Sequence, residues 1–290
     1  MTRAARRTLD GELVFDRYLG SGLELGRLQE LLLVLAPRWA TELRVRRSTR
    51  DQRPIAIADG GALEAAVMAA VNERGSTFDD QISRFGRPPF ERVVGSAELR
   101  GAGSELIVVI SVDATVASRL RQKVSLGNSI SLQCRRLSVE GEPAERWMRR
   151  AFERLCDGLS PVWAAAGDPD EYRVKVMSDP PVVEAIGRDF GRYLPGLFWL
   201  NFFGGRYREL IGDDRLRSAP APILAEPDSG VLIGLSDDPW GWNTAIYART
   251  ESAVGEHLGL VHFFDRLDPR RPWVAPDWSA SRGEPPHRAD

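Results

Sequence analysis

Period-two alternation of apolar residues in the middle of the chain is the feature that most constrains the fold. Between Leu106 and Val112 every second residue is a large aliphatic one. Between 129 and 134, Ile130, Leu132 and Cys134 alternate with serine and glutamine. Such alternation is typical of a strand that buries one face. The pattern predicts an antiparallel sheet with one solvated face.

Helical spacing appears on both sides of these strands. Apolar residues recur at intervals of three and four along Leu28–Leu35 and along Met148–Leu159, and Thr244–Leu258 is predicted as a last helix. We therefore expect an α+β fold, with a mixed or antiparallel sheet packed by three to five helices. A short echo, Leu35-Ala-Pro-Arg-Trp-Ala40 and Leu159-Ser-Pro-Val-Trp-Ala164, leaves two similar half-domains as a second possibility.

The length of 290 residues allows one large domain or two small ones, at about 100–200 residues each. The composition of the sequence changes after Gly167, and aromatic residues become dense. We expect an N-terminal α/β half over 1–167 and a C-terminal half over 168–267 that carries an aromatic motif. Residues 268–290 are dominated by Pro, Arg, Ser and Asp, which predicts a disordered or loosely packed tail.

The C-terminal half contains several short predicted elements. Glu171–Met177 has the pattern of a strand, and the aromatic run 195–205 has that of a buried strand or strand–turn. Residues 206–211 suit one or two helical turns. Segments 222–225 and 231–235 flank a Pro-Asp-Ser-Gly turn, which predicts a hairpin.

Charge and composition argue against several classes of protein. The chain carries 39 basic and 41 acidic residues, a net charge of −2, whereas nucleic-acid and anionic-membrane binders usually carry a basic excess. The longest strongly apolar run, 31–36, is far shorter than the ~20 residues of a membrane helix. No apolar signal core follows the basic start of the chain. We therefore expect a cytoplasmic protein with neither nucleic-acid nor membrane partners.

Motifs of catalysis and cofactor binding are absent or incomplete. Gly20–Gly26 has one residue too many for a dinucleotide fingerprint and is better explained as the turn that opens a helix. His257 and His262 are five apart, the wrong spacing for a helical zinc site, so we expect His257 near a helix C-terminus and His262 beside Phe263. Cys134 and Cys156 have the pattern of small core residues. We expect no catalytic residues, no cofactor and no metal.

Aromatic residues are dense in two places. The first group lies within ten residues, and burial in the core explains it best; it comprises Phe198, Trp199, Phe202, Phe203 and Tyr207. The second group differs, because two tryptophans flank a glycine directly after two aspartates and a proline. Acidic, aromatic loops suit protein recognition. We therefore identify Asp237, Asp238, Trp240 and Trp242 as a candidate protein interface, with burial in the core as the alternative.

A second acidic pair, Asp213-Asp214, also suits a basic partner. An ordinary solvated turn is the simpler explanation for this pair, as it is for Asp237-Asp238.

Residues 193–264 resemble a known family of small bacterial proteins. The resemblance rests on Leu194-Pro-Gly-Leu-Phe-Trp-Leu-Asn-Phe-Phe-Gly204 and on several shorter strings, namely Tyr207-x-x-Leu-Ile-Gly212, Asp214-Arg-Leu216, Ser218-Ala-Pro220, Gly230-Val-Leu, Asp238-Pro-Trp-Gly-Trp242, His257-Leu-Gly and Phe263-Phe-Asp265. The segment is similar to the predicted immunity proteins of polymorphic toxin systems, of the immunity protein 52 kind. The resemblance covers about a quarter of the chain.

This resemblance implies an α+β protein that binds and neutralises a cognate toxin, and it offers no catalytic residues to transfer. We therefore expect a non-enzymatic bacterial immunity protein whose partner is a toxin, basic in charge as a nuclease would be. Two alternatives stay open. One is a structural or adaptor component of a secretion or defence system, and the other is an enzyme without a recognisable motif.

Overall fold

The computed structural model describes residues 8–17, 19, 22–35, 43–46, 52–55, 61, 65, 95–101, 106–112, 128–134, 138–139, 142–177, 189–268 and 270–278. The chain forms two compact units: residues 1–13 with 133–278, and residues 14–132 with 279–290. The division thus falls within two strands and not at residue 167, where the composition of the sequence changes. Each unit is described by itself below.

Strands and helices together confirm the predicted α+β class. In the first unit the strand order is β11 (Ile223–Ala225), β12 (Gly230–Gly234), β10 (Leu200–Gly204), β9 (Trp163–Gly167) and the beginning of β1 (Leu9–Phe15). The pairs β11–β12, β12–β10 and β10–β9 are antiparallel. Phe202 stands opposite Leu232 on one side and Ala164 on the other. A small separate ladder joins β7 (Ser138–Val139) to β8 (Glu142–Pro143).

The second unit contains the strands predicted from alternation. β6 (Asn128–Cys134) is followed in the sheet by β5 (Leu106–Val112), β4 (Gly95–Gly101), β2 (Leu43–Arg46) and β3 (Gln52–Ile55). The last three pairings are antiparallel. Ile130 and Leu132 are buried, as the alternation predicts, whereas on the opposite face Ser131 is half-buried and Ser129 is buried. Helix α1 (Gly22–Leu35) buries an apolar stripe of Leu25, Leu28, Leu32 and Leu35.

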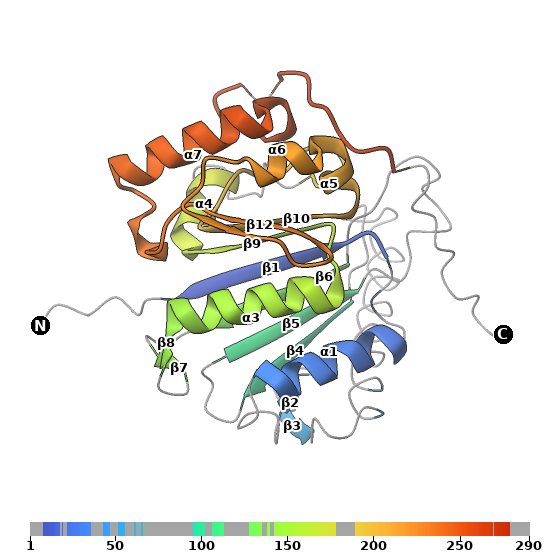
Figure 1. Ribbon diagram of the computed structural model, residues 1–290. Helices are drawn as coiled ribbons and strands as arrows, with labels where there is room; N and C mark the ends of the chain where they lie inside the picture. Colours follow the sequence, from blue (N-terminus) through green and yellow to red (C-terminus); the bar gives the residue numbers. More distant parts are fainter. Residues whose placement is uncertain are drawn as a thin grey trace, which may run out of the picture. The chain divides into compact units, whose positions relative to one another are not determined.

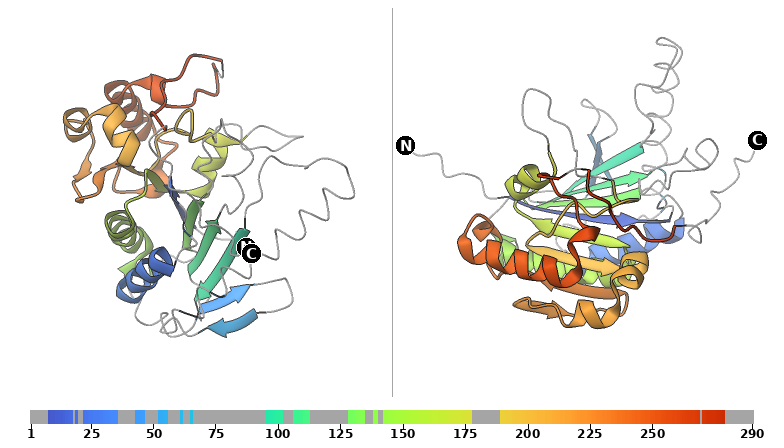
Figure 2. Two further views of the ribbon diagram at one scale, coloured as in Figure 1. Left: turned by 90° about the vertical axis from the view of Figure 1, so that its right-hand side faces the viewer. Right: turned by 90° about the horizontal axis from the view of Figure 1, so that it is seen from above.

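The core of the first unit is covered on both faces. Every residue of β9, β10 and β12 is buried. Helix α3 (Ala144–Leu159) lies on one face of β9 and β10, and helix α4 (Pro169–Val176) lies on the other (Figures 1 and 2). The predicted stripe of α3 is confirmed, since Met148, Ala151, Phe152, Leu155, Cys156 and Leu159 are all buried.

The prediction of a strand over Glu171–Met177 is wrong, because the segment up to Val176 belongs to α4 and Met177 is the C-cap of that helix. Asp168 has extended backbone, and its carboxylate accepts a hydrogen bond from the backbone N–H of Asp170 at 2.8 Å. Pro169 follows at the first helical position, where its missing N–H costs nothing. This cap starts a helix in a segment whose apolar pattern is too short to specify one.

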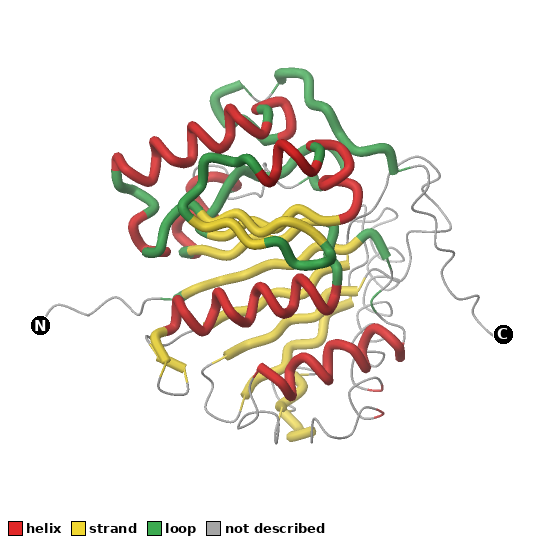
Figure 3. Tube along the Cα trace, viewed as in Figure 1, coloured by secondary structure: helices red, strands yellow, loops and turns green. Residues whose placement is uncertain are grey.

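Three further helices complete the first unit. They are α5 (Gly205–Ile211), α6 (Asp213–Arg217) and α7 (Ala245–Leu258), which lie side by side in chain order (Figure 3). Two single-turn helices, η1 (Pro239–Gly241) and η2 (Leu260–His262), flank α7. The predicted hairpin is confirmed as β11–β12, and the predicted last helix is confirmed as α7 with Thr244 as its N-cap.

Part of the segment expected to be a loose tail is packed against the first unit. Val274 donates its backbone N–H to the carbonyl of Val261 at 3.1 Å. Trp278 is 8% exposed and donates Nε1–H to the carbonyl of Gly191 at 3.1 Å. The remaining tail, 279–290, and the residues after Leu35 in the first copy of the short repeat lie outside the described residues.

Candidate interaction site

The four residues predicted to form an interface lie in a hydrogen-bonded turn that leads into α7. Asp238 caps η1, with Oδ1 accepting the backbone N–H of Trp240 at 3.0 Å. Gly241 then accepts at its carbonyl the backbone N–H of Thr244 at 3.0 Å and the Thr244 hydroxyl at 2.7 Å. The Thr244 hydroxyl oxygen in turn accepts the N–H of Tyr247 at 3.3 Å. We refer to residues 236–247 as the η1–α7 corner.

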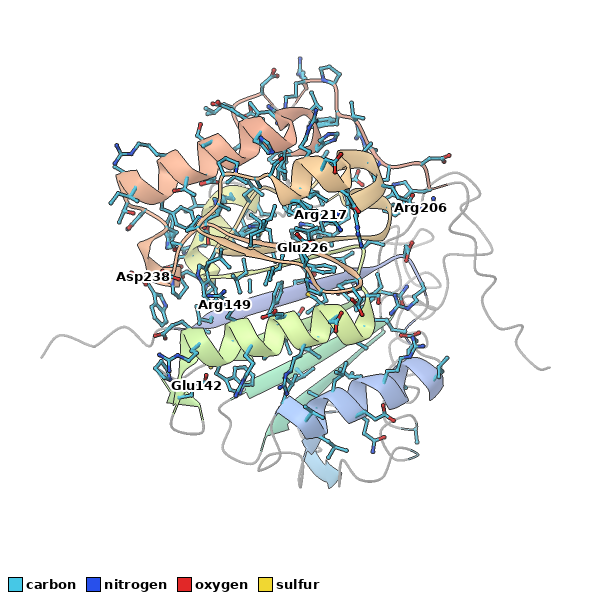
Figure 4. The ribbon with its side chains drawn as sticks, viewed as in Figure 1. Glu142, Arg149, Arg206, Arg217, Glu226 and Asp238 are labelled. Atoms are coloured by element: carbon cyan, nitrogen blue, oxygen red, sulfur yellow. The ribbon has the colours of Figure 1, made fainter. Side chains whose placement is uncertain are left out.

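The four predicted interface residues of the η1–α7 corner differ in exposure. Asp237 and Asp238 are exposed, while Trp240 and Trp242 are half-buried. Neither aspartate forms an ion pair with any residue in the described part of the chain. Figure 4 shows Asp238 well away from Arg206 and from the Arg217–Glu226 pair. Two exposed carboxylates without an ion-pair partner and two half-buried tryptophans therefore lie on this one segment.

A buried tryptophan fixes the base of the η1–α7 corner. Trp199 is 1% exposed and donates Nε1–H to the carbonyl of Ser236 at 2.8 Å. Its own carbonyl accepts the N–H of Leu235 at 2.9 Å. The first aromatic group is confirmed as core, because all five of its rings are buried. The hydrogen bond from buried Trp199 to Ser236 thus attaches the corner to the core.

Asp213 and Asp214 lie in a different environment. Arg208 holds Asp213 with two parallel hydrogen bonds, Nε to Oδ1 at 2.5 Å and Nη2 to Oδ2 at 2.8 Å. These bonds keep the pKa of Asp213 below its ordinary value. The charge of Asp213 is therefore neutralised within the protein, and only exposed Asp214 could attract a basic partner.

Sequence reasoning missed an ionic cluster that is built around a buried carboxylate and contacts the corner through Tyr247. Lys175 Nζ lies 2.7 Å from Glu171 Oε1 and 2.7 Å from Glu251 Oε1, and it also donates to the carbonyl of Leu197. Glu171 is fully buried, and its Oε1 accepts the Tyr247 hydroxyl at 2.6 Å. The three hydrogens of the ammonium thus match three acceptors. The cluster joins α4 to α7, and so fixes the first turn of α7.

The electrostatics of this cluster are set by burial. Burial raises the pKa of Glu171, and the opposing effects of Lys175 and the Tyr247 hydroxyl only partly offset this rise. Burial, followed by the neighbouring Glu171 charge, also raises the pKa of Tyr247. Glu171 Oε2 is buried without a hydrogen-bond partner, and it faces the Cα of Gly167 so closely that a Cβ there would lie 2.6 Å away. The cluster therefore connects α4 to α7, and keeping the Glu171 carboxylate charged in it lowers the stability of the folded protein.

Replacing Glu171 by glutamine is expected to change how stability depends on pH. A folded-state pKa above the ordinary 4.5 means that the folded protein holds a proton that the unfolded chain has already released. The contribution of Glu171 to the free energy of unfolding is therefore present below about pH 4.5 and is lost as the pH rises through the folded-state value. The difference in unfolding free energy, Glu171→Gln minus wild type, should increase over this range.

Urea denaturation at a series of pH values measures this difference. A flat or falling difference would mean that the ion pair with Lys175 dominates burial and holds Glu171 as a favoured carboxylate.

His257 and Ser218 are close enough to suggest a nucleophile and its base, but their hydrogen bonds exclude that arrangement. His257 Nε2 lies 2.8 Å from the carbonyl of Arg215 and 3.2 Å from Ser218 Oγ. Because a carbonyl only accepts, Nε2 carries the hydrogen and cannot take a proton from Ser218. Ser218 donates instead to the carbonyl of Asp214 at 2.6 Å. His257 links α6 to the last turn of α7, the helix end at which the sequence placed it.

The remaining candidates from the sequence are core residues. Cys134 and Cys156 are buried free thiols, and burial raises the pKa of Cys156. His262 is 5% exposed, next to buried Phe263, with Nδ1 at 3.1 Å from the carbonyl of Val274. Within the described ranges, no group of three or more His, Cys, Asp or Glu side chains is placed to hold a metal ion. None of the described helices combines the length and apolar character that crossing a membrane requires.

Comparison with known proteins gives few matches. No protein-family model and no curated protein matches the chain. Among solved structures, the chain is similar to the Pseudomonas aeruginosa T6SS protein PA0821, with a TM-score of 0.48 and 15% sequence identity, over 86% of this chain and 77% of that one.

Proposed function

We propose that this protein is a non-enzymatic bacterial immunity protein, which binds a toxin in the cytoplasm and blocks its active surface. The observation that carries the proposal is the η1–α7 corner. It presents the unpaired carboxylates of Asp237 and Asp238 beside half-buried Trp240 and Trp242, on a turn held by hydrogen bonds. A hydrogen-bonded turn with aromatic and charged side chains suits protein recognition, because little conformational freedom is lost on binding.

The resemblance to immunity proteins supports the same function, and one of its strings, Asp238-Pro-Trp-Gly-Trp242, lies in the corner. Its longest string, 194–204, ends in the buried strand β10 and includes core residues Phe198, Trp199, Phe202 and Phe203. Residues of this kind specify a fold and not a binding surface. The corner, by contrast, is attached to that core through Trp199 and carries the surface features.

The charge of the corner favours a basic partner. Residues 218–248 contain four acidic residues and neither lysine nor arginine. Of the four, Glu226 is paired with Arg217 at 3.0 Å, whereas Asp237 and Asp238 are unpaired within the described residues. A basic toxin surface, such as that of a nuclease, would be attracted to these two carboxylates.

Protection of growing cells tests the function. The toxin encoded beside the gene of this protein would be induced in a sensitive host with and without the protein. Growth restored by the wild-type protein, together with its co-purification with the toxin, is the expected result. A lethal neighbouring toxin that the protein neither binds nor suppresses, or the absence of any toxin gene beside it, would contradict the proposal.

Charge removal at the corner is expected to slow association with the toxin. Asn at 237 and 238 removes both charges but retains at 238 an oxygen that can cap η1. The association rate of the Asp237→Asn/Asp238→Asn protein should fall, and the difference from wild type should shrink as salt is raised. Asp214→Asn, which removes an exposed carboxylate outside the corner, is the control and should leave the rate nearly unchanged. Stopped-flow measurements at two salt concentrations give these association rates. If Asp214→Asn slowed association equally, the acidic part of the interface would not be confined to the corner and would include α6.

A further inference from the structure

Ile246 is the most exposed large apolar residue of α7. Its side chain is 71% exposed, although the neighbouring Tyr247 is 1% exposed. It occupies the second position of the helix, directly after Ala245, and Thr244 is the N-cap. An isoleucine in this position leaves a large aliphatic side chain in water at the end of the η1–α7 corner.

Formation of α7 does not require an isoleucine at this position. β-branched residues are weaker helix formers than alanine or unbranched polar residues. Acidic residues are favoured near the first turn of a helix, but the first turn of α7 contains none. The acidic residues of this region, Asp237 and Asp238, lie on the turn before the helix instead. An apolar residue placed where a charged one would serve the helix better points to a contact with a partner.

The position of Ile246 is fixed by the same bonds that fix the corner. Its neighbour Tyr247 donates its hydroxyl to fully buried Glu171 at 2.6 Å and its backbone N–H to Thr244. Thr244 is tied in turn to Gly241 in η1. Ile246 and the two tryptophans therefore lie on one hydrogen-bonded segment. Arg249, one turn later, is the first basic residue after Arg217, and its Nε donates to the carbonyl of Ala245 at 3.2 Å.

We infer that Ile246 is the apolar anchor of the interface, and that it inserts into an apolar depression bordered by basic side chains on the toxin. This inference rests on the proposed function and adds the chemistry of the partner's surface. The acidic residues precede the anchor on the same hydrogen-bonded segment, so complementary basic residues would lie on one side of that depression. Apolar anchors of this kind commonly dominate binding free energy when water is excluded around them.

Binding of the catalytically inactive form of the neighbouring toxin tests the inference. Ile246→Ala is expected to weaken binding at least tenfold in isothermal titration calorimetry, mainly by faster dissociation. The melting temperature should stay within a degree or two of wild type, because the side chain is mostly exposed already. Leu267→Ala is the matched control: Leu267 is 96% exposed but lies outside the corner, so affinity should be unchanged. The loss caused by Ile246→Ala should persist at high salt, unlike that caused by Asp237→Asn/Asp238→Asn.

Failure of the inference and failure of the function are distinguishable. Wild-type protein that does not bind the toxin overturns both. Wild-type binding with unchanged affinity of Ile246→Ala overturns the inference alone. Self-association of the wild-type protein in sedimentation velocity, abolished by Ile246→Ala, would identify a second copy of this chain as the occupant and would also overturn it.

Discussion

Replacing Trp199 by alanine is expected to lower the free energy of unfolding by about 3–5 kcal/mol. The side chain is 1% exposed, and its ring lies where β10 begins, between the core and the η1–α7 corner. Its removal leaves a cavity and deprives the carbonyl of Ser236 of its Nε1–H donor. Urea denaturation followed by circular dichroism measures the change.

Trp199→Phe is the intermediate variant. It retains a buried aromatic ring but removes the Nε1–H donor and part of the indole volume, so a loss smaller than that of Trp199→Ala is expected. If Trp199→Ala unfolded at the same denaturant concentration as wild type, the ring would contribute nothing to the core and the attachment of the corner would need another explanation.

Replacing Lys175 by methionine is expected to cost about 3–5 kcal/mol, because it leaves the fully buried carboxylate of Glu171 without its cation. Methionine has a similar length and fits the position occupied by the aliphatic part of lysine. The Leu197 carbonyl loses its donor as well. Thermal or urea denaturation at neutral pH measures the loss.

A double variant provides the control for this charge effect. Glu171→Gln/Lys175→Met removes the buried negative charge together with the cation, and most of the lost stability should return. Lys175→Arg should be destabilising despite its charge, because a planar guanidinium cannot match the three acceptors around the ammonium. Equal losses in the single and the double variant would show that packing, and not an unpaired charge, explains the effect.

Local pattern was sufficient for much of the fold. The period-two segments became β5 and β6, the stripe of Met148–Leu159 became α3, and the Pro-Asp-Ser-Gly turn became the β11–β12 hairpin. The two strands and α3 are long enough to repeat their pattern several times, and the hairpin is closed by a turn with its own chemistry, so short-range signals suffice. The fold class followed directly from their combination.

The error at α4 shows where such signals fail. Eight residues make few repeats of any period, and the sequence Asp168-Pro169 was more informative than the apolar pattern. Once the helix is recognised, Glu171 and Lys175 are four residues apart on one face, which would have suggested their ion pair. Treating the segment as a strand concealed it.

The rest of the cluster depends on contacts distant in the chain. Tyr247 donates to Glu171 across 76 positions of sequence, and no local pattern predicts such a pairing. The neutralisation of Asp213 had a weak local signal, Arg208 five residues earlier, but its bidentate geometry required the turn at Gly212 between α5 and α6. The interface at Asp237, Asp238, Trp240 and Trp242 remains a prediction, because exposure permits binding without demonstrating it.

The activity of the purified toxin against increasing amounts of this protein tests the central claim most directly. A non-enzymatic protein that occludes its target should abolish toxin activity at one equivalent per toxin, with inhibition complete as soon as binding is. Trp240→Ala should weaken the complex by at least ~2 kcal/mol per folded molecule, about thirtyfold, and shift the titration accordingly. Toxin inactivated progressively by far less than one equivalent would indicate an enzyme, and activity unaffected by a large excess would show that this protein does not neutralise the toxin.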